Sequence, residues 1–344
     1  MKKVKRSVKI VIAVALVIML LLSSGVIFYL SKLNLIKFSN GKFTRSGSPD
    51  MSDSETLEEE SRMNEAIADL EERDAIDATG EIYKDKRFLN ILLIGTDERA
   101  ESFSENARGD SCMIMSIGKK DGSLKLASLE RGMGVPILEG KYKGQYDWLT
   151  HTFRYGGADL MMREVRECFK VDVERYIRVN FTTFKKGIDS VGGIDITLTA
   201  AEAAYVNKYT RRKSYTAGVN HLDSDAALAY ARCRHIDSDW HRIERQRNVI
   251  QAVVTKTKDL SVTELNTLLN NVLPLVQTNL TRLEITELLL SAPKYRGVQI
   301  KQMTVPISGS YGGMRGLGGR SLFSVDFDTN AKALREFIYG VTTE

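Results

Sequence analysis

Five arginines lie within residues 231–247, whose sequence is ARCRHIDSDWHRIERQR. A guanidinium group keeps its charge and binds phosphate oxygens in pairs, so converging arginines indicate a multiply charged phosphate ligand. Arg232 and Arg234 share a face if the chain is extended there. Arg242 and Arg245 share a face if the next helix begins at about residue 242. The alternative is a solvated helix face on which the arginines pair with neighbouring carboxylates.

Two aspartates form a second group of candidate site residues. Asp97 follows the first apolar run of the chain, and Asp110 directly precedes the second. If these runs are neighbouring strands, the two carboxylates meet at one edge of a sheet, with Arg99 and Arg108 beside them. Two carboxylates with open positions suit Mg²⁺, which takes oxygen ligands and keeps several for water and phosphate. The alternative is that they are ordinary turn residues.

The apolar pattern predicts the elements that would position these side chains. Compact apolar runs indicate strands, and apolar residues at helical spacing indicate helices between them. Strands are expected at 89–94, 111–117, 123–129, 176–180, 194–198 and 301–307. Helices are expected at 158–169, 182–191, 224–231, 242–258, within 263–290 and at 329–339, and a loop at 308–321. This alternation predicts a single α/β globular domain over 88–344, a central mixed β-sheet flanked by helices.

The N-terminus has the pattern of a membrane anchor. Five basic residues precede the uncharged run 10–30, which is long enough to cross a bilayer core of roughly 30 Å as a helix. Basic residues on the short side predict that residues 1–9 are cytoplasmic and that the rest of the chain is extracytoplasmic. A cleaved signal peptide is the alternative. We therefore expect a single-pass protein of the cell membrane.

Residues 31–87 are expected to form a linker and an acidic stalk helix. Residues 50–85 hold 14 acidic and three basic residues. Met63, Ile67 and Leu70 form a narrow apolar stripe at helical spacing. The pattern favours a solvated stalk, and the alternative is a helix that self-associates or binds a partner.

Three cysteines, Cys112, Cys168 and Cys233, are far apart in the sequence. They show none of the spacings of a zinc site or a disulfide framework. We expect buried thiols, with a nucleophilic cysteine as the alternative.

Seven stretches together resemble the LytR-CpsA-Psr family of membrane-anchored cell-envelope glycopolymer transferases. Their order and spacing agree with the family from Phe88 to the C-terminus. The stretches are NILLIGTDER, RGDSCMIMSIG, LASLERGMGVPI, THTFRYGGADLM, DSVGGIDITL, HLDSDAALAYARCR and DWHRIERQR.

The resemblance implies an extracytoplasmic phosphotransferase that acts on a glycan linked to polyprenyl pyrophosphate. It would move the glycosyl phosphate to a peptidoglycan hydroxyl, typically the 6-hydroxyl of N-acetylmuramic acid, and release polyprenyl phosphate. The glycan would be wall teichoic acid, capsule or a similar polymer. The lipid tail would lie in an apolar tunnel. Metal and arginines suffice for such chemistry, since phosphoryl transfer needs mainly positioning and charge neutralisation.

The resemblance also implies roles for particular residues. Asp97 and Asp110 would hold Mg²⁺. The pyrophosphate would be surrounded by Arg108, Arg131, Arg232, Arg234, Arg242 and Gln246, with Arg99 and Arg245 at neighbouring positions. The expected catalytic residues are Arg108, Glu130 and Arg131.

The chain departs from the family pattern at two places. The family usually has Pro-Arg-Asp where this chain has Glu130-Arg131-Gly132, so the carboxylate after the arginine is missing and Glu130 is a candidate replacement. His241 stands where glycine is common, next to Trp240, which we expect to pack on the start of the helix. His151 lies in a matching motif and is expected to be structural.

Two other classes of function are open. A non-catalytic envelope protein could bind polyprenyl pyrophosphate or anionic wall polymer, and Gly132 favours this reading. Transcriptional control would need contact with DNA, yet almost all arginines are expected outside the cytoplasm, so no nucleic-acid partner is predicted. Hydrolysis of the pyrophosphate is a side reaction that the same site would support.

Overall fold

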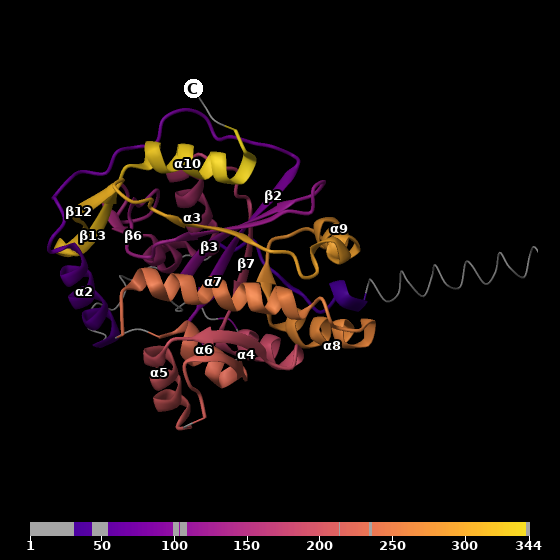
Figure 1. The fold of residues 1–344 in the computed structure, drawn as a ribbon. Helices are drawn as coiled ribbons and strands as arrows, with labels where there is room; N and C mark the ends of the chain where they lie inside the picture. Colours follow the sequence, from indigo (N-terminus) through magenta and orange to yellow (C-terminus); the bar gives the residue numbers. More distant parts are fainter. Residues whose placement is uncertain are drawn as a thin grey trace, which may run out of the picture.

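The computed structural model describes residues 31–42, 54–98, 103, 109–212, 214–233 and 236–341. Within them, seven strands form one mixed sheet at the centre of the molecule (Figure 1). Their order is β1 (Lys37–Phe38), β10 (Gln277–Thr278), β7 (Arg175–Val179), β2 (Phe88–Thr96), β3 (Gly109–Gly118), β4 (Leu124–Leu129) and β11 (Lys301–Val305). β2, β3 and β4 are antiparallel neighbours, whereas β7 is parallel to β2 and β11 is parallel to β4.

Helices cover both faces of this sheet, which gives three layers (Figure 1). α3 (Leu149–Phe169) and α10 (Phe327–Tyr339) lie on one face, and α7 (Asp239–Lys256) and α9 (Arg282–Ser291) on the other. In β2, Leu92 and Ile94 pack with Phe153 of α3, while Ile91 packs with Ile285 of α9. Successive side chains of a strand point to opposite faces, so a strand covered on both sides is apolar throughout.

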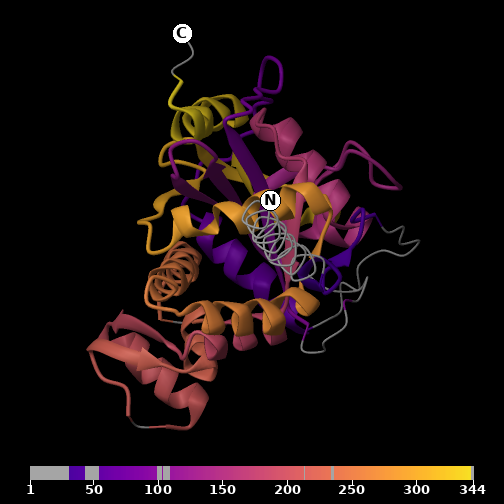
Figure 2. The same cartoon turned by 90° about the vertical axis from the view of Figure 1, so that its right-hand side faces the viewer.

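A second lobe extends below the sheet in both views (Figures 1 and 2). It consists of α4 (Phe181–Ser190), α5 (Ala200–Thr210), α6 (Ser224–Ala231) and the hairpin of β8 (Ile194–Leu198) with β9 (Gly218–Leu222). These elements bury an apolar core of their own. α8 (Val262–Val272) packs against α4, and the 3₁₀ turns η1 (Leu273–Leu275) and η2 (Ala292–Tyr295) follow α8 and α9.

The predicted fold class and most predicted elements are confirmed. The strands expected at 123–129, 176–180 and 194–198 are present within a residue at each end, and the helix expected at 224–231 is present with the same bounds. α3 begins nine residues earlier than expected. Gly156 and Gly157 interrupt its helical backbone, and this interruption hid the first part of the helix in the sequence pattern. The three cysteines are free and buried, as predicted.

The loop expected at 308–321 is wrong in part. This segment contains β12 (Tyr311–Arg315), which forms a hairpin with β13 (Ser321–Val325) around the 3₁₀ turn η3 (Leu317–Gly319). Two glycines in β12 hid the strand pattern, since glycine is unfavourable in strand interiors. Gly312 is required by a close approach, because a Cβ atom there would lie 2.6 Å from the carbonyl oxygen of Glu71. A further short pair, β5 (Gly134–Pro136) and β6 (Tyr146–Trp148), lies beside this hairpin.

The predicted solvated stalk is also wrong for its helical part. α2 (Ser54–Ile67) packs against β13, and its Met63 and Ile67 are buried with Trp148 and Leu322 (Figure 1). The apolar stripe was expected to lie on a solvated stalk, with self-association or partner binding as the alternative. It is used inside the domain. A narrow stripe suffices because the rest of this small core comes from β6, β12 and β13. The globular part of the chain thus begins before the expected boundary at residue 88.

The predicted membrane segment, 10–30, and the predicted cytoplasmic residues, 1–9, lie outside the described residues. In the part of the chain that the structure describes, no helix combines the length and the apolar character that a membrane span requires.

Candidate functional site

A cavity of about 280 Å³ lies where β2, β3 and β7 meet α4, α6 and α7. It opens at the carboxyl ends of the parallel strands β2 and β7, the common position of ligand sites in sheets of this kind. Most of its wall is apolar. The apolar lining consists of Leu93, Ile94, Met113, Ile177, Val179, Phe181, Phe184, Leu228, Ala231 and Ile250.

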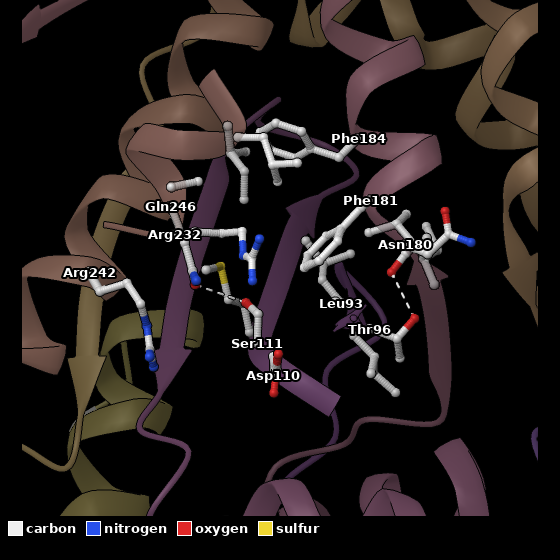
Figure 3. A pocket seen from close by; sticks show the side chains of 18 residues that line it. Leu93, Thr96, Asp110, Ser111, Asn180, Phe181, Phe184, Arg232, Arg242 and Gln246 are labelled. Carbon is white, nitrogen blue, oxygen red and sulfur yellow. Dashed lines mark hydrogen bonds between the residues drawn. The ribbon is translucent and has the colours of Figure 1, made fainter. Parts of the chain in front are cut away.

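Polar side chains gather at one end of this first cavity. Figure 3 shows Arg232, Arg242 and Gln246 entering from the side of α6 and α7. The guanidinium of Arg232 lies over the ring of Phe181, 4.7 Å from its centroid. The hydroxyl of Ser111 donates to Oε1 of Gln246 at 3.0 Å. Three of the predicted phosphate-binding residues therefore line one cavity whose wall is mostly apolar.

Asp110 reaches the same cavity through a β-bulge. Gly95 of β2 pairs with Ser111, but Thr96 pairs with Gly109, so Asp110 is an extra residue on β3. Bulges of this type turn a side chain away from the regular ladder and are frequent next to active sites. Asp110 lines the cavity together with the arginines.

Asp97 lies one residue beyond β2, at the same end of the sheet as Asp110. The carboxylate oxygens of these residues are the donor type that Mg²⁺ prefers. Among the described residues, no three histidine, cysteine, aspartate or glutamate side chains come together as a metal site. Two carboxylates are too few for a closed structural metal site, and an ion held by them would take its other ligands from water and phosphate.

Arg245 is not brought to this cavity. Its Nε donates to Glu202 of α5 at 2.7 Å, and Nη1 donates to the carbonyl of Cys233 at 3.1 Å, while Asp237 binds Nη2. α7 begins at Asp239 rather than near residue 242, and Arg245 lies at the end of its first two turns, where it faces Glu202 of the second lobe. This arginine joins the two lobes.

Arg131 and Glu130 lie in a second, neighbouring cavity of about 350 Å³. Nε of Arg131 donates to Asp239 at 3.0 Å and Nη1 donates to Glu59 at 2.6 Å. Burial alone would lower the pKa of Arg131, but the carboxylates of Asp239 and Glu59 hold this pKa above its usual value. Asp239 also lies 3.1 Å from Nη1 of Arg242, so one carboxylate connects the two cavities.

Glu130 is fully buried at the wall of the second cavity. Burial and the nearby charge of Asp239 raise the pKa of its carboxyl group to about 7. Oε2 accepts a hydrogen bond from the backbone N–H of Gly132. Oε1 has no hydrogen-bond partner among the residues that the structure describes. A carboxyl group whose pKa lies near neutrality, and one of whose oxygens no described residue binds, is suited to accept a proton.

Three further arginines were predicted to lie near the pyrophosphate. Arg99, Arg108 and Arg234 lie outside the described residues. Trp240 was expected to pack on the start of its helix, but it packs on Tyr311 of β12, with ring centroids 5.5 Å apart, and lines the second cavity.

His151 lies in a buried polar network that lines neither cavity. Its Nδ1 is 3.1 Å from Oδ2 of Asp147, and Arg320 donates to the other oxygen of Asp147 at 2.6 Å. Burial favours the neutral carboxyl, but His151 and Arg320 hold the pKa of Asp147 below its usual value.

Sequence reasoning missed several residues of the two cavities. Phe181 and Phe184 are three apart at the start of α4 and both line the first cavity, so their helical spacing was the available signal. Glu59 stands in an acidic run of three, and nothing in that run distinguishes it from its neighbours. Asp239 was passed over as a spacer between arginines.

Comparison with known proteins agrees with this architecture. TagU of Bacillus mycoides, a polyisoprenyl-teichoic acid–peptidoglycan teichoic acid transferase, is 34% identical over 197 residues, 56% of this chain and 61% of that protein. TagT of Bacillus subtilis, which carries the same description, is 32% identical over 181 residues, 51% of this chain and 55% of that protein. The matched region thus spans less than two thirds of the length of these curated relatives.

Solved structures have the same fold. TagT bound to LIIa-WTA superposes with a TM-score of 0.59 and 25% identity, over 78% of this chain and 97% of that one. TagT with bound octaprenyl pyrophosphate lipid superposes with a TM-score of 0.55 and 23% identity, over the same shares. The sequence profile of the LytR_cpsA_psr family matches residues 51–335, from just before α2 to within α10. The chain therefore belongs to the LytR_cpsA_psr family.

Proposed function

We propose that this protein transfers a glycosyl phosphate from a polyprenyl-pyrophosphate-linked glycopolymer to a hydroxyl group of peptidoglycan, the 6-hydroxyl of N-acetylmuramic acid. The descriptions of TagU and TagT as teichoic acid transferases support this reaction, as does the likeness to TagT bound to LIIa-WTA. The donated polymer would be wall teichoic acid, capsule or a similar glycan.

The observation that carries the proposal is the first cavity, with its apolar wall and cationic end. A polyprenyl pyrophosphate has an apolar chain and a multiply charged head, and the cavity offers a partner for each. Phe181 and Phe184 would contact the chain, and Arg232 and Arg242 would bind the phosphates. Guanidinium groups in a partly buried site bind phosphate more strongly than they do in water.

The reaction needs one displacement at phosphorus. The acceptor oxygen forms a bond to the phosphorus that carries the glycan, and the bond from this phosphorus to the bridging oxygen breaks. The electron pair leaves with polyprenyl phosphate, and the acceptor proton goes to a base. Glu130 is the base in this proposal, because its buried carboxyl has a pKa near 7 and an oxygen that no described residue binds.

The second cavity would then receive the acceptor. It contains Glu130 and Arg131, and Asp239 connects it to Arg242 of the first cavity. The phosphorus under attack would lie where the two cavities adjoin.

Asp97 and Asp110 would hold Mg²⁺ in this proposal, on the grounds of their donor type and their common end of the sheet. The ion would supply neutralisation of the charge that develops on the phosphate oxygens. Anchoring by residues 10–30, with the domain on the extracytoplasmic side, would bring this site to lipid-linked donors and to peptidoglycan.

The proposed function is tested by incubating the full chain with synthetic polyprenyl-pyrophosphate glycan and uncrosslinked peptidoglycan, with and without Mg²⁺. Mass spectrometry should detect a phosphodiester-linked product only with the ion. Glu130→Gln should lose the product and retain lipid binding, while a matched Glu164→Gln variant retains both.

A second candidate function is favoured by Gly132, which leaves the site without a carboxylate after Arg131. A non-catalytic binding protein would retain the lipid and form no product with any donor glycan, under conditions in which a related transferase is active. That result would replace the transferase proposal.

A further inference from the structure

Helix α2 is attached to the domain by two kinds of buried contact. Met63 and Ile67 lie in an apolar core with Leu322. Nε of Arg320 donates to Glu60 at 2.8 Å, and the side chain of Arg320 is 1% exposed. α2 is thus held by an apolar core and a partly buried ion pair, and it forms part of the wall of the second cavity.

Glu59 of this helix reaches the arginine in the second cavity. Its Oε1 accepts from Nη1 of Arg131 at 2.6 Å, and the two side chains are 8% and 4% exposed. Asp239 binds a different nitrogen of the same guanidinium, Nε, at 3.0 Å. A planar guanidinium that is held at two separate nitrogens has its orientation fixed.

Gly132 accommodates the same helix. A Cβ atom at residue 132 would lie 3.1 Å from Sδ of Met63 and 3.3 Å from Oε2 of Glu130, and would collide with Cε of Met63. Met63 follows Glu59 by four residues, so the two side chains project from one face of α2. Met63 therefore occupies the space that a side chain at residue 132 would need, while Glu59 supplies a carboxylate to Arg131.

We propose that Glu59 is a positioning residue of the phosphate site. Residue 132 is a glycine and supplies no carboxylate to Arg131, so α2 supplies one through Glu59. Glu59 fixes Arg131, and Asp239 extends this fixed arrangement to Arg242 at the wall of the first cavity. The inference rests on the proposed function, because the ligand that these arginines receive is the pyrophosphate of that reaction.

The first experiment compares Glu59→Gln with Glu58→Gln in the full chain. Glu58 is the matched control, since it belongs to the same helix but its side chain is 60% exposed and pairs with Arg62 on the surface. Titration calorimetry with farnesyl pyrophosphate as the probe should show affinity about tenfold lower for Glu59→Gln and unchanged for Glu58→Gln. With the glycan donor, kcat of Glu59→Gln should fall by on the order of 100-fold, since misplacing a catalytic group has effects of this size.

A rescue experiment separates the carboxylate from the packing of the helix. Met63→Ala opens the space beside residue 132, and Gly132→Asp then returns a carboxylate there. In the background of Glu59→Gln and Met63→Ala, Gly132→Asp should bind farnesyl pyrophosphate about tenfold more tightly than the isosteric Gly132→Asn. Circular dichroism and thermal unfolding give the folded fraction of each variant, so that only folded protein is compared.

The outcomes are distinct. Tighter binding by Glu59→Gln would overturn the inference, because Glu59 would then compete with phosphate for Arg131. Equal affinities of Glu59→Gln and Glu58→Gln, or of the two rescue variants, would also overturn it. A wild-type chain that binds farnesyl pyrophosphate but transfers no glycan would instead overturn the proposed transferase function. The affinities of Glu59→Gln and Glu58→Gln for farnesyl pyrophosphate would still decide the role of Glu59 in binding.

Discussion

Asp239 accepts a hydrogen bond from Nε of Arg131 at 3.0 Å, although 108 residues separate the two in the chain. The same carboxylate lies 3.1 Å from Arg242. Each arginine belongs to a different cavity, so Asp239 is the charge that holds the two halves of the site together. The sequence offers Asp239 only as a residue between two groups of arginines, whereas the fold makes it their common partner.

Asp239→Asn should lower the free energy of unfolding by about 1–3 kcal/mol, the usual range when a partly buried charged hydrogen bond is weakened. It should also lower the pKa of Glu130, because the negative charge of Asp239 helps to raise that pKa. Urea unfolding measures the first effect, and its pH dependence measures the second. Asp225→Asn, which removes a surface pair with Lys185, is the control and should change stability little. An unaltered Glu130 titration in Asp239→Asn would contradict the coupling.

The buried carboxyl of Glu130 should make folding stability depend on pH. Its pKa is about 7 in the folded protein and 4.5 is the ordinary value. Between these values the folded state binds more protons than the unfolded state, so stability falls as pH rises from about 4.5 to about 7. The full contribution is roughly 3 kcal/mol. Glu130→Gln stays neutral and should lack this decline when its urea unfolding is compared with wild type.

Glu164→Gln is the matched control for this prediction. Burial raises the pKa of Glu164 to about 8, and its Oε1 accepts from the backbone N–H of Leu138 away from both cavities. Its replacement should remove a similar decline in stability that extends to higher pH, and should leave transfer activity intact.

In wild type, kcat should rise through about pH 7 as Glu130 loses its proton, if this carboxyl is the base. A flat profile would assign the base to another group.

The parts of this fold that could be predicted are those in which local pattern and burial agree. Five of the six residues of LNILLI are apolar because β2 is covered on both faces, and the helix from Ser224 to Ala231 is capped by the side chain of Asp223. The opposite case is α2, whose strongly acidic composition indicates a solvated helix. Its place is set by Arg131 and Arg320, which are distant in the chain, and no local pattern reveals such partners.

The candidate site was predictable to a similar extent. Residue type and spacing indicated Arg232 and Arg242, and the family resemblance added Gln246; all three share one cavity. Type and spacing were not enough to separate Arg245, because Arg242 and Arg247 lie within three residues of it and its partner Glu202 belongs to another helix. Residues three apart on a helix point in directions about 60° apart. Spacing alone therefore does not decide which of Arg242 and Arg245 faces a cavity.

Asp110→Asn should remove the dependence of farnesyl pyrophosphate binding on Mg²⁺. The amide keeps the shape and one oxygen but loses the charge that a hard cation requires. Calorimetric titrations of farnesyl pyrophosphate with Mg²⁺ and with EDTA should differ for wild type and agree for the variant. Asp259→Asn, an exposed residue at the far end of α7, is the control. The metal assignment would be wrong if the variant retained the wild-type response to EDTA.

Phe184→Ala should weaken the binding of a prenyl chain and spare the binding of its charged head. Phe184 lines the apolar wall of the first cavity, whereas Arg232 and Arg242 lie at its polar end. Loss of the ring removes apolar contact worth about 1.5–3 kcal/mol, so farnesyl pyrophosphate should bind roughly 10-fold to 100-fold more weakly. Inorganic pyrophosphate should bind as it does to wild type, because it never reaches the ring. Leu283→Ala, at a side chain that is 68% exposed on α9, should affect neither ligand. Parallel losses of both ligands in Phe184→Ala would mean that the ring supports the arginines, and the lipid chain would then have to lie elsewhere.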